Sequence, residues 1–147
     1  MFDEEHIGVL TDDGKLVINE AYCHNGHDLL DNELEISGYP SIKLLVSDKK
    51  HEEIINISAV EGDQQRKFKK GFADKTLLTV SCPMCKEELD NIAPCDCVKG
   101  SKYVAIYLNK KRTFGGCVGV CNSWGCFRSF MGSAWRIISR LADKTSK

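Results

Sequence analysis

The stretch Cys82-Pro83-Met84-Cys85, followed by Cys95-Asp96-Cys97, places four thiols within sixteen residues of the chain. A Cys-x-x-Cys turn delivers two sulfur ligands to one metal ion, and zinc prefers four such ligands in a tetrahedron. On an extended strand, side chains two residues apart point to the same face, so both sulfurs of Cys95-x-Cys97 can reach one ion. The stretch therefore predicts a structural zinc site made of Cys82, Cys85, Cys95 and Cys97.

The string from Cys82 to Leu89 resembles the metal knuckle of zinc-ribbon and RING-type proteins. The RING pattern then requires a Cys-x-His pair and another Cys-x-x-Cys, whereas this chain has Cys95-x-Cys97 and no further cysteine until Cys117. The resemblance to a zinc ribbon covers the knuckle alone, and it implies antiparallel strands around a structural zinc ion. Iron held by the same four cysteines, as in rubredoxin-like proteins, is the alternative.

A second group of potential ligands begins at Cys23-His24-Asn25-Gly26-His27, and three more cysteines follow in the glycine-rich residues 114–126. These two segments predict a second zinc site, for which we expect the ligands Cys23, His27, Cys121 and Cys126. A set with Cys117 in place of Cys121 is the alternative. Otherwise Cys117 is expected to be a small buried hydrophobic residue, and His24 an exposed neighbour of the site.

The first six residues contain neither a basic region nor an apolar one, so they predict no secretory signal. No apolar run approaches the roughly 18 residues that cross a membrane. We therefore expect a cytoplasmic protein, in which clustered cysteines are more often metal ligands than disulfides.

The charge is distributed unevenly along the 147 residues. Residues 1–65 carry 15 acidic and 4 basic side chains, a balance of −11, and residues 66–147 carry 6 and 16, a balance of +10, which together give the net charge of −1. Mutual neutralisation of two packed halves is the simpler explanation, and an anionic partner for the basic half is the other. We expect one zinc-binding domain spanning residues 1–147, and no internal repeat is apparent.

The hydrophobic pattern predicts a mainly β, small α+β fold with antiparallel strands. A hairpin is expected over residues 7–18, and strands are expected over residues 42–46, 54–60, 76–80 and 103–108. Residues 28–41 are acidic and rich in turn formers, and predict a loop. A short C-terminal helix is predicted from Ser133 as its N-cap and from apolar residues at helical spacing, namely Ala134, Ile137, Ile138 and Leu141.

No catalytic residue can be assigned from this pattern. His51-x-Glu53 with Pro94-Cys95 resembles part of the zinc-deaminase signature, but that signature requires Pro-Cys-x-x-Cys. A metal-dependent enzyme or an iron-containing redox protein is thus the third of three hypotheses.

The first hypothesis is a zinc-stabilised interaction module whose partner is another protein. The second is a nucleic-acid-binding zinc protein, based on the basic half and on four aromatic residues near basic ones, Phe68, Trp124, Phe127 and Phe130. Bases stack only on accessible rings, so the exposure of these aromatics tests the second hypothesis.

Overall fold

The computed structural model describes residues 8–130 except 61, 62, 64, 96, 113–115, 127 and 128. Within this part every named element is a strand: β1 (Val9–Leu10), β2 (Leu16–Val17), β3 (Leu30–Ile36), β4 (Tyr39–Ser47), β5 (Glu52–Ile57), β6 (Arg66–Lys67), β7 (Thr79–Ser81), β8 (Asn91–Pro94), β9 (Lys102–Tyr107), β10 (Cys117–Cys121) and β11 (Ser129–Phe130). The expected mainly β fold is confirmed, and the expected C-terminal helix lies outside the described residues. The described residues include no helix with the length and apolar character to cross a membrane.

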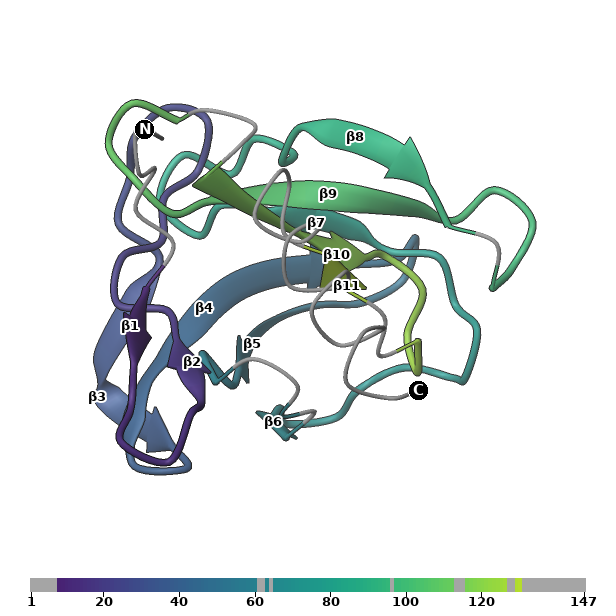
Figure 1. The fold of residues 1–147 in the computed structure, drawn as a ribbon. Helices are drawn as coiled ribbons and strands as arrows, with labels where there is room; N and C mark the ends of the chain where they lie inside the picture. The colour runs from purple at the N-terminus through teal and green to yellow at the C-terminus, as the bar shows by residue number, and fades with distance from the viewer. Residues whose placement is uncertain are drawn as a thin grey trace, which may run out of the picture.

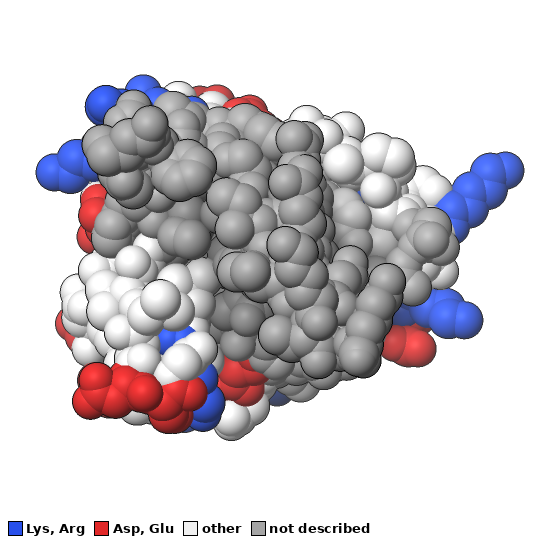
Figure 2. All heavy atoms as spheres, viewed as in Figure 1, with Lys and Arg blue, Asp and Glu red and all other residues white. Residues whose placement is uncertain are grey.

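The strands form three antiparallel sheets (Figure 1). One is the β1–β2 hairpin, one has the order β3-β4-β5-β6 with β7 also paired to β4, and one has the order β11-β10-β9-β8. The second sheet combines strands of the acidic half with β6 and β7 of the basic half. Around the described rim of the face in Figure 2, acidic and basic side chains accordingly lie next to each other.

The hairpin predicted within residues 7–18 and the strands predicted within residues 42–46 and 54–60 are confirmed, and one predicted loop is wrong. β1 pairs with β2, and β4 pairs with β5, with Leu44 opposite Ile55. Residues 28–41 contain β3 and the start of β4, joined by a turn at Ser37 and Gly38. Both turn residues have positive φ, 57° and 88°, as in the type I′ turns whose twist suits a hairpin.

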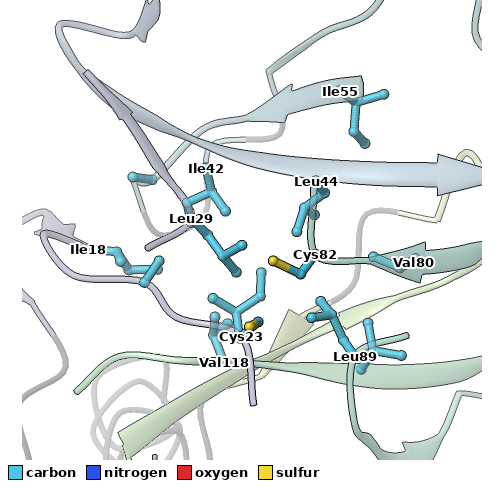
Figure 3. Close-up of a cluster of buried hydrophobic side chains, with 14 of the residues drawn as sticks. Ile18, Cys23, Leu29, Ile42, Leu44, Ile55, Val80, Cys82, Leu89 and Val118 are labelled. Carbon is cyan, nitrogen blue, oxygen red and sulfur yellow. The ribbon is translucent and has the colours of Figure 1, made fainter. Parts of the chain in front are cut away.

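The core is built from alternating positions of two central strands. Ile42, Leu44 and Val46 point to one face of β4, and their exposed fractions are 2% or less. Val104, Ile106 and Leu108, on and just after β9, are fully buried. Figure 3 shows side chains of β4 and β5 across the core from Leu89 and from Val118 of β10. Burying each such aliphatic side chain contributes about 1.5–3 kcal/mol, so these positions hold the two larger sheets together.

The two larger sheets contain three-stranded units with the same connectivity, β3-β4-β5 and β8-β9-β10. A tight turn with two potential metal ligands precedes each unit. The residue before each turn pairs with the central strand of the other unit, Tyr22 with Tyr107 of β9 and Ser81 with Leu45 of β4. Within the described residues, the two units thus share their connectivity and exchange their leading segments, since the segment before each unit pairs with the central strand of the other.

Backbone hydrogen bonds repeat in the same way. Leu29 N–H donates to the carbonyl of Ala21 at 2.7 Å, and Leu89 N–H donates to that of Val80 at 2.9 Å. Both leucines are buried, with exposed fractions of 0% and 2%. The exchange brings the two ligand-bearing turns together at the seam between the units.

Glu53 of β5 anchors the connection between β6 and β7. Its side chain is only 5% exposed and accepts hydrogen bonds from the backbone N–H groups of Lys69 and Gly71, both at 2.9 Å, and of Lys70 at 3.3 Å. His51 Nε2 lies 2.7 Å from the same carboxylate. Burial opposes ionisation, but these donors together lower the pKa of Glu53 from its usual 4.5.

Replacing Glu53 by Gln is expected to lower the free energy of unfolding by about 2 kcal/mol. The side-chain amide of Gln has one oxygen acceptor and an NH₂ donor, so its NH₂ group would face backbone N–H groups that also donate. Since the folded pKa is depressed, the carboxylate stabilises the fold fully above about pH 4.5 and loses this effect as the pH falls through the folded value. Denaturant unfolding of both proteins checks this. Glu52→Gln, which changes the exposed neighbour, should behave as wild type, and an equal loss in both variants would contradict the anchoring role.

Candidate metal centres

Four potential ligands gather at the seam between the two units, and we call this cluster site 1. It consists of Cys23, His27, Cys82 and Cys85, whose ligand atoms all lie within 4.8 Å of one another. Cys23 and Cys82 are fully buried, and Figure 3 shows them inside the core among apolar side chains.

Each half of site 1 is a closed turn. In the first, Cys23 N–H donates to the carbonyl of His27 at 3.1 Å, and Gly26 N–H donates back to that of Cys23 at 2.9 Å. In the second, Cys82 N–H donates to the carbonyl of Glu87 at 3.1 Å, and Lys86 N–H donates to that of Cys82 at 2.8 Å. Lys86 has a φ of 62°, so it occupies a left-handed position that favours glycine. The ligand atoms of the two turns thus converge on one point.

Backbone and side-chain donors surround the sulfurs of site 1. Asn25 N–H donates to Cys23 Sγ at 3.3 Å, Met84 N–H donates to Cys82 Sγ at 3.3 Å, and the Asn25 amide donates to Cys85 Sγ at 3.5 Å. The backbone N–H of Glu87, together with Asn25, lowers the pKa of Cys85 to about 6. Burial raises the pKa of Cys82 to about 11. A thiolate at Cys82 therefore requires a cation beside it.

A second cluster, site 2, lies at one end of the β8-β9-β10 unit. It consists of Cys95 and Cys97 in the connection between β8 and β9, Cys121 at the end of β10, and Cys126, whose sulfurs all lie within 4.8 Å of one another. Cys95 is buried and the other three are half-buried. Site 2 is thus closer to solvent than the two core cysteines of site 1.

The segments that carry the ligands of site 2 are also held by backbone hydrogen bonds. Cys95 N–H donates to the carbonyl of Ser101 at 3.1 Å, and Cys126 N–H donates to that of Ser123 at 3.1 Å. Ser123 N–H donates to Cys121 Sγ at 3.4 Å. Although burial opposes it, the backbone N–H of Cys97 and the Tyr103 hydroxyl lower the pKa of Cys95 to about 6. Burial raises the pKa of Cys121 well above its usual value.

The separations of the ligand atoms fit tetrahedral zinc. Bond lengths of about 2.3 Å to sulfur and 2.05 Å to nitrogen place two sulfurs about 3.8 Å apart and a sulfur and a nitrogen about 3.6 Å apart. In site 2, Cys97 and Cys121 Sγ are 3.5 Å apart and Cys95 and Cys126 Sγ are 3.9 Å apart. In site 1, Cys23 Sγ and His27 Nδ1 are 3.4 Å apart. All eight cysteines are free of disulfides.

The expected grouping of the ligands differs from the observed one. All eight residues selected as ligands lie in the two clusters, but Cys82 and Cys85 lie with Cys23 and His27, while Cys95 and Cys97 lie with Cys121 and Cys126. The expected four-cysteine site of Cys82, Cys85, Cys95 and Cys97 is therefore corrected. Strand β8 causes the separation, because four extended residues of about 3.3 Å each carry Cys95 away from Cys85.

The other singled-out residues lie outside these clusters. Cys117 is fully buried in β10, as expected, and is absent from site 2. His24 is not the exposed neighbour that was expected: its side chain is 22% exposed, and its Nε2 lies 3.2 Å from Glu87 Oε1. His51, from the partial deaminase pattern, is paired with Glu53 and belongs to neither cluster.

No protein-family model, no curated protein and no solved structure matches this chain.

Proposed function

We propose that sites 1 and 2 each hold a zinc ion, and that the protein is a zinc-stabilised interaction module in which both metals are structural. The observation that carries this proposal is the gathering of four Cys or His ligand atoms within 4.8 Å at each site. Structural zinc takes four protein ligands, whereas catalytic zinc takes three and keeps a position for water.

The position of each site supports a structural role. Site 1 joins turns that are separated by about 60 residues of sequence, from Cys23 and His27 to Cys82 and Cys85. Site 2 ties the β8–β9 connection to the segment that follows β10. A metal in site 1 would therefore link the two units, and one in site 2 would brace the end of the second unit.

Zinc is the metal that the ligands of site 1 support, because three thiolates and one imidazole form a common structural zinc set. Iron in the four sulfurs of site 2 is the alternative, since sets of four cysteines also bind iron in electron-transfer proteins. Zinc has no visible absorption of its own, so the two metals are readily distinguished.

The test is the metal content of the purified protein, together with its visible absorption spectrum. We expect two zinc ions per chain and no visible colour. One zinc ion per chain would remove one of the two structural sites from the proposal. Iron with visible absorption would overturn it in favour of a redox protein.

A further inference from the structure

A short basic segment that begins in β6 and a tryptophan that follows β10 form one surface. The segment is Arg66-Lys67-Phe68-Lys69-Lys70, in which the three lysines and Phe68 are exposed. Trp124 belongs to the segment between two ligands of site 2. We call Arg66–Lys70 and Trp124 together the basic aromatic surface.

The aromatic rings of this surface contact one another directly. Phe68 meets Trp124 edge to face, with ring centroids 5.0 Å apart and an interplanar angle of 85°. The Arg66 guanidinium lies over the Trp124 ring, 5.3 Å from its centroid, and Phe72 packs against another part of the ring at 5.4 Å. Phe68 nevertheless keeps 46% of its surface exposed. Trp124 thus supports a ring that is available for stacking.

A buried carboxylate and a glycine hold the backbone of this segment in place. The Glu53 carboxylate accepts hydrogen bonds from the consecutive N–H groups of Lys69, Lys70 and Gly71. Gly71 has a φ of 72°, and a Cβ at this position would lie 2.8 Å from the Phe68 ring and 3.0 Å from the Trp124 ring. The backbone therefore packs directly beneath both rings, and the lysine side chains remain in solvent.

Site 2 supports the tryptophan. Trp124 lies between Cys121 and Cys126, and its backbone N–H and carbonyl bond to Thr76 and Lys75, both at 2.8 Å. A metal ion that joins Cys121 and Cys126 would fix the segment that positions Trp124.

We propose that the basic aromatic surface binds single-stranded nucleic acid, with Phe68 stacking on a base and the flanking lysines contacting phosphates. The proposal rests on the proposed function in one respect, because zinc in site 2 holds Trp124 beneath Phe68. Single-strand binding proteins combine a basic surface with accessible aromatic rings, and this surface combines both within five consecutive residues.

A protein partner is less well supported by the exposed side chains. Among the residues that the structure describes, the large hydrophobic side chains that are exposed come from separate segments, namely Val9, Leu10, Tyr39, Ile54, Phe68, Leu77 and Met84. Phe68 is the one among them that basic residues flank on both sides. Charge and aromaticity coincide there, which favours a polyanion with stackable groups.

The test is fluorescence anisotropy of the full-length, zinc-loaded chain with fluorescein-labelled 12-nucleotide oligouridine and oligothymidine. We expect Phe68→Ala to weaken binding by about 5- to 150-fold, the range that loss of one stacked base gives. Tyr39→Ala, which removes an exposed ring elsewhere, should leave binding unchanged. Lys69→Glu/Lys70→Glu should weaken binding and lower its salt dependence, whereas the control Lys49→Glu/Lys50→Glu should change it far less.

Three outcomes would overturn the proposal. The first is absence of binding to either oligonucleotide at 100-fold molar excess, and the second is an equal effect of the control variants. The third is equally effective competition by a polyaspartate of the same charge, which would indicate an acidic protein partner. Zinc is counted in every sample: failure to bind with two zinc ions per chain overturns this inference alone, whereas failure to retain zinc overturns the proposed function.

Discussion

Replacing Cys82 by serine is expected to abolish the folded state of the whole chain. Structural zinc contributes roughly 10–16 kcal/mol in small peptides, whereas a domain is stable by only about 5–15 kcal/mol. Cys82 is fully buried, and its turn joins the two units through Cys23 and His27. The variant would lose a ligand of site 1 and leave the other thiols of the site in the core without a cation. Far-ultraviolet circular dichroism and thermal unfolding measure the effect.

Cys117→Ala is the matched control for Cys82→Ser, because Cys117 is equally buried but lies outside both clusters. The control removes only a small buried group, so its free energy of unfolding is expected to fall by about 1–3 kcal/mol. It is also expected to keep both zinc ions. A cooperatively unfolding Cys82→Ser protein with two zinc ions would contradict the role of site 1.

The double variant Cys97→Ser/Cys121→Ser is expected to lose the zinc of site 2 and to remain folded. Both cysteines are half-buried, and site 1 and the core between β4 and β9 keep all their residues. The segment that carries Trp124 should loosen, because two of the four sulfurs that tie it to the β8–β9 connection are gone. In a Trp135→Phe background, Trp124 fluorescence should therefore shift to longer wavelength.

The control for this double variant is Trp135→Phe alone, whose emission should change only after a chelator removes zinc. Complete unfolding of the double variant would show that site 2 is as important for the fold as site 1. Unchanged Trp124 emission would show that site 2 does not position this residue.

The strands were largely predictable because their signals are local. β4, β5 and β9 are short runs rich in β-branched, aliphatic and aromatic residues, many of them buried, so their composition was sufficient to find them. β3 was missed because acidic and amide residues separate its three apolar ones, Leu30, Leu34 and Ile36, of which only Ile36 is fully buried. The Ser37-Gly38 pair was the one local signal for a hairpin between β3 and β4.

The ligands were predictable, but their grouping was not. Thiols and imidazoles in close spacing identify residues suited to metal, and their metal binding stays a prediction. Cys85 and Cys95 are only ten residues apart in sequence, yet strand β8 separates them, so proximity along the chain was misleading. The grouping depends on the exchange of leading segments between the two units. This exchange is made by long-range pairings, Tyr22 with Tyr107 and Ser81 with Leu45, which local sequence patterns do not indicate.

The shared connectivity of the two units had only a weak signal in the sequence. A buried leucine follows each ligand-bearing turn, Leu29 six residues after Cys23 and Leu89 seven residues after Cys82. The turns differ in length and in their second ligand, which obscured the correspondence. Recognising it would have placed the two turns at one site.

The most direct test of the two proposed zinc sites is zinc analysis of the Cys97→Ser/Cys121→Ser variant, by metal content and by X-ray absorption at the zinc edge. The observed clusters predict one zinc ion per chain, bound by three sulfurs and one nitrogen from Cys23, His27, Cys82 and Cys85. In the alternative grouping, the site of Cys82, Cys85, Cys95 and Cys97 would lose Cys97. The second site, of Cys23, His27, Cys121 and Cys126, would lose Cys121, so both sites would be damaged. Loss of both zinc ions, or a remaining ion bound by four sulfurs, would contradict this grouping of the ligands.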